Sequence, residues 1–177
     1  MLVVFTKQEH CKYLVTVTRS DRVKLQFQGV GKKFLLPHDL SHFIVESLLN
    51  MYRGFWGCVA SGALFSGMNI IDGRQKAHAK SKSKQIIKES HQQLRLAECM
   101  VRVFDEISVA NLDSNPPQAQ QRFSQIPLDI KPKLSNATII DVCSAFKAFT
   151  NNWQAIDIAK SIELNWNEKF PSKSLRL

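Results

Sequence analysis

The sequence has little cysteine: it contains four cysteines, and each lies more than forty positions after the one before it. No two of them have the short spacing of a zinc knuckle or a redox-active dithiol, so the sequence excludes both kinds of site. We also expect no signal peptide, because Leu2 to Phe5 is the only apolar run before Lys7, and a signal peptide needs roughly 7 to 15 apolar residues. We therefore expect a cytoplasmic protein with reduced thiols.

Long apolar runs are absent too, with one partial exception. Residues 54–71 carry no charged side chain, and this length just reaches the lower limit of about 17 residues for a membrane-spanning helix. Four glycines, two serines and one asparagine interrupt the segment, which is more typical of a small-residue helix packed inside a globular core. The sequence therefore predicts no membrane span.

The composition indicates a folded chain of ordinary domain size. Of its 177 residues, 44% are hydrophobic and 22% are charged, which gives enough apolar surface to offset the entropy of ordering the backbone. We expect a single domain over residues 1–177. Within it we predict a basic connection at residues 72–84 and a proline-rich, irregular linker at residues 111–134.

Three segments have the pattern of β-strands. Residues 13–18 and 23–28 are rich in Val, Leu, Phe and Thr, and the polar cluster between them predicts a hairpin. Residues 162–166 alternate apolar and polar side chains and predict a final strand. Helices are predicted over four further ranges: residues 38–53, 54–66, 85–107 and 138–149.

These elements together predict an α+β fold. We expect a small antiparallel sheet of roughly three or four strands, built from the N-terminal hairpin and the C-terminal strand and covered by about four helices. In the predicted helix over residues 54–66, small residues recur every four positions: Gly54, Cys58, Gly62 and Ser66. Such a stripe allows close approach of another backbone, so we predict that Gly62 packs tightly against a helix or strand.

The helix that follows Pro37 carries the strongest candidate for chemistry. It is apolar around most of its circumference, and its polar arc of about 120° includes His38, Asp39, His42 and Glu46. His38 and His42 lie one turn apart, about 6 Å along the axis, a spacing that suits chelation of zinc or another divalent metal. The spacing resembles the H-E-x-x-H helix of zinc peptidases, with Asp39 where that family has its general-base glutamate.

The other residues of this arc have predicted supporting roles. Asp39 and Glu46 are candidates for proton transfer at a catalytic metal, in a hydrolase for instance. Glu46 lies about 12 Å along the axis from His38, so we expect it to orient His42 rather than to bind the ion. A third ligand would come from elsewhere, with four candidates: His10, Cys11, His78 and His91. The alternative is that these polar side chains are simply solvated, with Asp39 favoured by the helix dipole.

The net charge of +9 is concentrated in one segment. Residues 73–95 contain seven basic residues and one acidic residue, so this segment alone carries +6. Its side chains predict a non-enzymatic alternative, in which the segment contacts an acidic partner or binds nucleic acid weakly and without sequence preference. No aromatic residues alternate with the lysines, so base stacking is not predicted. The basic residues concerned are Arg74, Lys76, Lys80, Lys82, Lys84 and Lys88.

Two further interpretations of these segments stay open at this point. The basic segment is more typical of a solvated loop than of a binding surface. A scaffold protein or homo-oligomer would use the small-residue helix, or exposed aromatic side chains, as its subunit contact.

The string L-P-H-D-L-S-H-F-I-V-E at residues 36–46, followed by G-F-W-G at residues 54–57, resembles a bacterial family of uncharacterised proteins. Members of that family carry L-P-H-D-L-x-H-x-x-V-E, then a G-F-W-G run, and residues 162–166 resemble the family's closing strand. The resemblance implies a single domain. It implies no chemistry, because the family has no established activity.

Overall fold

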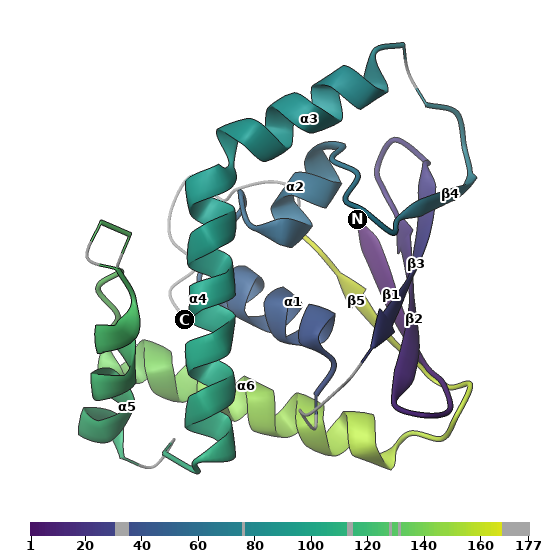
Figure 1. Cartoon of the computed structure of the whole chain (residues 1–177). Coiled ribbons are helices and arrows are strands. Elements are labelled where there is room, and N and C mark those ends of the chain that lie inside the picture. The colour runs from purple at the N-terminus through teal and green to yellow at the C-terminus, as the bar shows by residue number, and fades with distance from the viewer. Residues whose placement is uncertain (31–35, 76, 113–114, 128, 131, 168–177) are drawn as a thin grey trace.

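The computed structural model describes residues 1–30, 36–75, 77–112, 115–127, 129–130 and 132–167. Within these residues the strands form one antiparallel sheet in the order β4-β3-β2-β1-β5 (Figure 1). The strands are β1 (Leu2–Lys7), β2 (Lys12–Thr18), β3 (Lys24–Val30), β4 (Asn69–Asp72) and β5 (Ser161–Asn165). The C-terminal strand therefore pairs with the N-terminal strand, and the two ends of the fold are held together.

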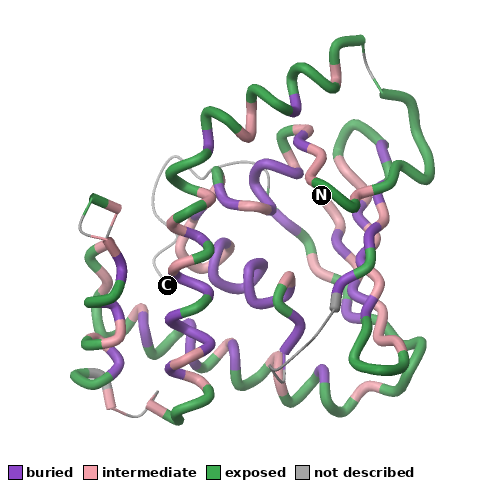
Figure 2. Tube along the Cα trace, viewed as in Figure 1, coloured by how far each residue is buried: buried purple, intermediate pink, exposed green. Residues whose placement is uncertain are grey.

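The register of the sheet separates an inner face from an outer face. Phe5 of β1 lies opposite Val15 of β2 and Ile162 of β5, and each of these three side chains is buried. Because successive side chains of a strand point to opposite faces, the residues directly before and after each of these three face away from the core. Figure 2 shows buried residues concentrated on the helices that lie against the sheet and on alternate positions of its strands.

The described helices lie on one side of the sheet, with α1 between the sheet and α4 (Figure 1). Helix α1 also contacts α2 and α6. Its residues from Leu40 to Glu46 are all buried, as expected for a helix with so narrow a polar arc. The helices are α1 (His38–Leu48), α2 (Phe55–Ser61), α3 (Ala79–Glu89), α4 (His91–Val109), α5 (Pro116–Arg122) and α6 (Asn136–Ala155), with a 3₁₀ turn η1 (Phe123–Gln125).

The α+β prediction is confirmed, including the antiparallel hairpin and the C-terminal strand. Two strands were not predicted: β1, a short apolar run, and β4, whose four residues are all exposed. The described residues also contain more helices than the four predicted. No helix among the described residues has the length and apolar character that crossing a membrane requires.

Two predicted helices end earlier than expected. Helix α1 ends at Leu48 instead of continuing to residue 53, because Asn50 adopts a φ of 55°, which a right-handed helix does not contain. Helix α2 covers Phe55–Ser61, and Gly62 ends it with a φ of 111°. A Cβ on Gly62 would meet no heavy atom closer than 3.9 Å, so the prediction of tight packing there is wrong. Glycine is suited to this position by its positive φ.

Three other boundaries also differ from prediction. The predicted basic connection at 72–84 is shorter than expected, because α3 already begins at Ala79. The predicted helix at 85–107 is divided between the end of α3 and α4, which begins at His91. The predicted irregular linker at 111–134 contains α5, where the Asn115 side chain accepts a hydrogen bond from the Gln118 amide. Helix α6 continues through the asparagines at 151 and 152, because Trp153 beyond them is buried.

Candidate metal centre

The imidazole of His42 lies in the middle of α1, buried between two carboxylates. The residue is only 3% exposed. Its Nδ1 lies 2.9 Å from Oε1 of Glu46, one turn later in α1, and its Nε2 lies 3.4 Å from Oε2 of Glu98 in α4. Each ring nitrogen therefore faces a different carboxylate, and the packing of α4 on α1 builds the site.

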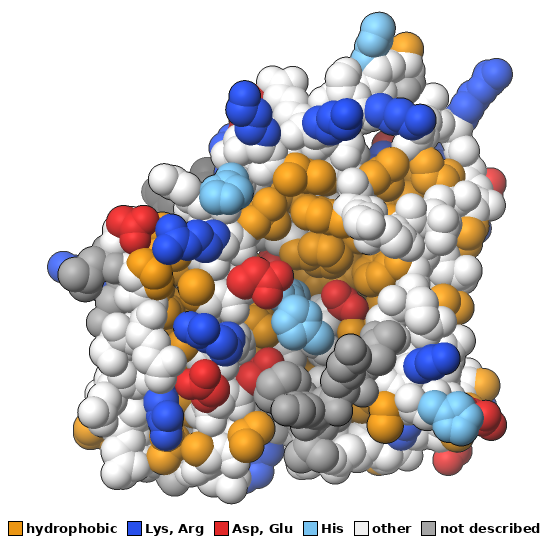
Figure 3. All heavy atoms as spheres, viewed as in Figure 1, with side chains coloured by type: hydrophobic (Ala, Val, Ile, Leu, Met, Phe, Trp, Pro, Cys, Tyr) orange, Lys and Arg blue, Asp and Glu red, His pale blue; other side chains and the backbone are white. Residues whose placement is uncertain are grey.

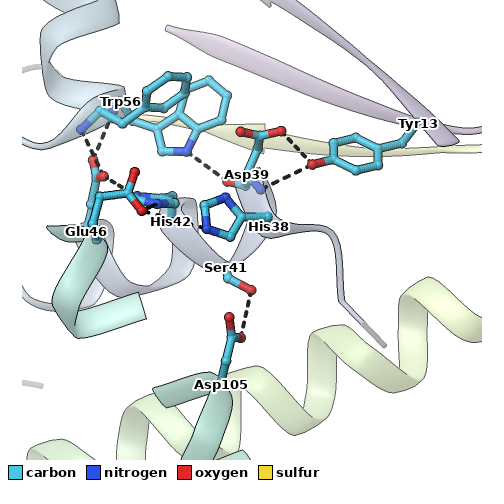
Figure 4. Close-up of polar contacts among 10 residues, drawn as sticks. Tyr13, His38, Asp39, Ser41, His42, Glu46, Trp56 and Asp105 are labelled. Carbon is cyan, nitrogen blue, oxygen red and sulfur yellow. Dashed lines mark hydrogen bonds and ion pairs between the residues drawn. The ribbon is translucent and has the colours of Figure 1, made fainter. Parts of the chain in front are cut away.

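Glu46 is fully buried, and both of its carboxylate oxygens have donors (Figure 4). Oε1 faces the His42 ring and also accepts the backbone N–H of Phe55 at 2.9 Å. Oε2 accepts the backbone N–H of Trp56, also at 2.9 Å. Gly54 permits this approach, because a Cβ at that position would lie 2.4 Å from Cδ of Glu46. Glu46 is thus placed to orient His42, with no exposed oxygen for a substrate.

His38 and Glu98 lie on the exposed side of His42. Their side chains are 46% and 64% exposed, and His38 Nε2 lies 3.8 Å from Glu98 Oε2. The rings of His38 and His42 have centroids 4.7 Å apart. One ligand atom from each of the three residues lies within 4.8 Å of the other two. Two histidines from α1 and one glutamate from α4 therefore converge.

The Asp39 carboxylate points away from this group, toward the sheet (Figure 4). Its Oδ2 accepts the hydroxyl of Tyr13 at 2.5 Å, and its backbone carbonyl accepts the indole N–H of Trp56 at 2.9 Å. Burial raises the pKa of Tyr13, and the neighbouring Asp39 charge raises it further, so the phenol stays protonated as a donor. These two bonds fix the start of α1 against both β2 and α2.

The site residues influence one another's protonation. Burial lowers the pKa of His42, but its hydrogen bonds to Glu46 and Glu98 outweigh burial and raise the pKa to about 10. Burial lowers the pKa of His38, and the nearby His42 lowers it further. Complete burial raises the pKa of Glu46, yet its described hydrogen-bond partners all donate, which favours the carboxylate. The hydrogen bond with His42 lowers the pKa of Glu98.

A pocket of about 340 Å³ opens beside the site, and His38 and Asp39 form part of its wall. Figure 3 shows hydrophobic side chains gathered in a hollow on this face, with histidine and acidic side chains at its lower edge. Lys and Arg side chains lie over α3 at the upper edge of the hollow. The other residues that line the pocket are Tyr13, Phe27, Gln28, Gly29, Phe55, Phe65, Ser66 and Met68.

A second buried polar pair joins α1 to α4. The Ser41 hydroxyl donates to Oδ1 of Asp105 at 3.3 Å, with exposures of 0% and 6% for the two residues. Burial raises the pKa of Asp105 to about 7, although Ser41 and the charge of His42 act in the opposite direction. No sequence pattern had singled out this pair.

The structure brings some of the sequence-predicted site residues together and separates others. His38 and His42 share one face, and Glu46 accepts the Nδ1 proton of His42, as the sequence had predicted. Asp39 is bound to Tyr13 instead of facing the histidine pair. None of the four predicted third ligands (His10, Cys11, His78 and His91) belongs to the group with His38 and His42, among the residues that the structure describes.

Glu98 is the site residue that sequence reasoning missed. It lies on the polar face of α4, more than fifty residues after His42, where an exposed glutamate is ordinary. Only the packing of α4 across α1 places it beside the two histidines. The single sequence signal was indirect, because two histidines at this spacing need a third ligand from another element.

The basic segment forms a separate, exposed feature. Arg74, Lys80, Lys82, Lys84 and Lys88 are all exposed, and the four lysines belong to α3. Lys76 lies outside the described residues. The segment is therefore mostly helix, in contrast to the predicted connection.

Comparisons with family models, curated proteins and solved structures found no match for this chain. The resemblance of residues 36–46 to an uncharacterised bacterial family stays a prediction. The chemistry of the site must therefore be argued from its geometry.

Proposed function

We propose that this chain binds a divalent metal ion through His38, His42 and Glu98, and that the bound ion supports hydrolysis of a substrate in the adjacent pocket. One observation carries the proposal. Three ligand atoms from two packed helices lie within 4.8 Å of one another. The buried Glu46 carboxylate holds Nδ1 of His42, the most buried of the three ligands. That second carboxylate is the partner which metal-binding histidines commonly have.

The distances fit a small ion after a minor adjustment. Ligands around a tetrahedral zinc ion, bound at about 2.0 to 2.1 Å, lie roughly 3.3 Å from one another. The distance from His42 Nε2 to Glu98 Oε2 is 3.4 Å, and that from His38 Nε2 to Glu98 Oε2 is 3.8 Å. His38 and Glu98 are the more exposed of the three, so rotation of their side chains can supply the remaining approach while His42 stays fixed.

The ligand types favour zinc or a similar borderline metal. Imidazole nitrogens suit zinc, and calcium or magnesium would call for oxygen ligands alone. Two histidines and one glutamate are also a ligand set of catalytic zinc sites, in which three protein ligands leave the fourth position to water. A metal in such a site lowers the pKa of the bound water and so supplies a nucleophile at neutral pH.

The residues around the ion would then divide the remaining roles. Glu46 accepts the Nδ1 proton of His42, which fixes the tautomer that leaves Nε2 free for coordination. Asp39 lines the pocket and accepts the Tyr13 hydroxyl, so it is the carboxylate available for proton transfer to or from a substrate. Glu46 has no exposed oxygen and is a positioning residue.

The competing interpretation is a purely structural ion-pair cluster. In the metal-free protein, a protonated His42 between two carboxylates satisfies the same atoms without any ion. Zinc titration separates the two interpretations, because only a metal site binds the ion with the histidines as ligands.

The experiment is a calorimetric titration of zinc into chelator-treated protein without a histidine tag. We expect one site per chain, lost in a His38→Ala, His42→Ala double variant and retained in His91→Ala, which changes a histidine outside the group. Zinc-dependent cleavage of an activated phenyl ester then tests the hydrolytic part. Equal zinc binding by the parent protein and the double variant would contradict the proposal.

A further inference from the structure

The pocket beside the candidate metal centre has an aromatic lining. The rings of Phe55 and Phe65 have centroids 4.9 Å apart, and those of Phe27 and Phe55 have centroids 6.2 Å apart. Phe55, Phe65 and Met68 line the pocket and are only partly buried, so part of each side chain is open to a ligand. With a volume of about 340 Å³, the pocket has the size that small organic ligands occupy.

One carboxylate lies in this largely apolar wall. Asp39 is the only Asp, Glu, Lys or Arg among the described residues that line the pocket. His38 also lines it, but burial and the nearby His42 lower the pKa of its imidazole, so the ring is uncharged at neutral pH. The Tyr13 phenol is neutral too, because burial and the Asp39 charge raise its pKa. The wall of the pocket therefore carries a single negative charge.

Tyr13 holds the Asp39 carboxylate in place and leaves one of its oxygens available. The Tyr13 hydroxyl donates to Oδ2 of Asp39 at 2.5 Å, and the Trp56 indole holds the backbone carbonyl of Asp39 at 2.9 Å. Oδ1 of Asp39 accepts no hydrogen bond within the part of the chain that the structure describes. Figure 4 shows the carboxylate turned toward Tyr13 and away from His42. Oδ1 can therefore accept a hydrogen bond from a ligand in the pocket.

Charges of opposite sign lie at the two edges of the hydrophobic hollow. Figure 3 shows acidic side chains and histidine at its lower edge, and basic side chains over α3 at its upper edge. Helix α3 carries a lysine row, formed by Lys80, Lys84 and Lys88, which recur every four residues and share one face of the helix. This separation of charge orients a ligand that has one cationic end and one apolar end, with the cation toward the acidic edge.

We propose that the pocket binds arylalkylamines, with the ring among the phenylalanine side chains and the ammonium group on the Asp39 carboxylate. An ammonium group donates charge-assisted hydrogen bonds to a carboxylate, and aromatic faces attract a cation within about 6 Å. An anionic ligand would be repelled by Asp39, and a neutral ligand would leave that charge without a counter-charge. The proposal concerns the pocket alone and does not depend on a metal ion.

The test compares three small molecules by calorimetry with metal-free protein. 2-Phenylethylamine carries the ring and the cation, 2-phenylethanol has nearly the same shape without the charge, and ethylamine has the charge without the ring. We expect 2-phenylethylamine to bind at least about tenfold more tightly than either of the other two. Equal affinities for 2-phenylethylamine and 2-phenylethanol would overturn the proposal, and so would equal affinities for 2-phenylethylamine and ethylamine.

Two variants assign the effect to particular side chains. Asp39→Asn keeps an acceptor for the Tyr13 hydroxyl but removes the charge, so the amine and the alcohol should bind with similar affinity while the affinity for the alcohol is unchanged. Phe65→Ala should weaken binding of 2-phenylethylamine and leave binding of ethylamine as it was. An undiminished preference for the amine in Asp39→Asn would contradict the placement of the ammonium group.

Glu98→Gln is the matched control. Glu98 is a carboxylate of the candidate metal centre, but it is not among the described residues that line the pocket. This variant should keep the preference for the amine and lose zinc affinity, whereas Asp39→Asn should do the reverse. Equal loss of the preference in both variants would overturn the role of Asp39.

Zinc titration of the same preparations separates the two proposals. Normal zinc binding without a preference for the amine would overturn the pocket assignment and leave the metal site intact. A clear preference for the amine without zinc binding would overturn the metal site alone. Loss of both in the parent protein would overturn both proposals.

Discussion

The polar arc of α1 and the lysine row of α3 differ in how their side chains are held. In α1, His42 and Glu46 are buried and bonded to each other, and Glu46 is also bonded to two backbone amides of α2. In α3, Lys80, Lys84 and Lys88 are exposed, as expected for lysines on the outer face of a helix. A buried polar group must have partners, so its geometry is fixed and can serve coordination chemistry. An exposed lysine supplies charge with little fixed geometry.

The largest effect expected from this contrast is the loss of Glu46. Glu46→Ala leaves His42 and the amides of Phe55 and Trp56 without their buried acceptor. We expect the free energy of unfolding to fall by about 3 to 5 kcal/mol, measured by urea denaturation of metal-free protein. Glu98→Ala is the comparison, since it removes the exposed carboxylate and should cost less than about 1 kcal/mol. Similar losses in both variants would break the distinction between the buried and exposed parts of the site.

The second effect concerns the buried carboxyl of Asp105. Its pKa is about 7 in the folded protein, against an ordinary value of 3.8. Between pH 3.8 and 7 the folded state therefore keeps a proton that the unfolded state has released. Asp105 therefore reduces stability as pH rises from about 4 to 7, and the loss is complete above pH 7. The free energy of unfolding of Asp105→Asn, minus that of the parent protein, should be about 2 to 4 kcal/mol larger at pH 8 than at pH 4. A constant difference in unfolding free energy across this range would contradict the assignment.

A third effect follows from the competition between a metal and a proton at His42. The pKa of His42 is raised to about 10, whereas that of His38 is lowered, so at neutral pH zinc must displace one proton, from His42. Apparent zinc affinity should rise about tenfold for each pH unit between roughly 7 and 8.5. Titrations at several pH values measure this slope. A slope of zero would mean that His42 is not a ligand.

The smallest effect is expected in the lysine row. Lys84→Gln removes one exposed charge and should change the free energy of unfolding by less than about 0.5 kcal/mol. Thermal denaturation of the Lys84→Gln and Lys82→Gln proteins provides the measurement. A larger loss in either variant would show that α3 depends on its lysines for stability, and the contrast with α1 would weaken.

The sequence predicted the parts of the fold and site that depend on local patterns. Alternation predicted the hairpin, and apolar periodicity predicted the burial of α1. The spacing of His38 and His42 placed both on one face, and the position of Glu46 one turn after His42 predicted their contact. These features involve residues within one element, where 3.6 residues per turn or alternate facing is sufficient.

The parts that the sequence did not predict depend on distant packing or on single backbone angles. Glu98 joins the site only because α4 crosses α1, and the bond between Tyr13 and Asp39 requires β2 to lie beside the start of α1. The early end of α1 follows from the positive φ of Asn50, and Gly62 was interpreted as a packing residue although its φ of 111° is the reason for glycine. Composition alone does not report such angles.

The most direct test of the metal site is a crystal structure of the zinc-loaded protein, with anomalous diffraction recorded above and below the zinc absorption edge. We expect one anomalous peak per chain, about 2.0 to 2.1 Å from nitrogens of His38 and His42 and in contact with a Glu98 oxygen. Glu46 should retain its hydrogen bond to Nδ1 of His42. An anomalous peak at other residues, or none in a crystal that contains zinc at saturating concentration, would contradict the account.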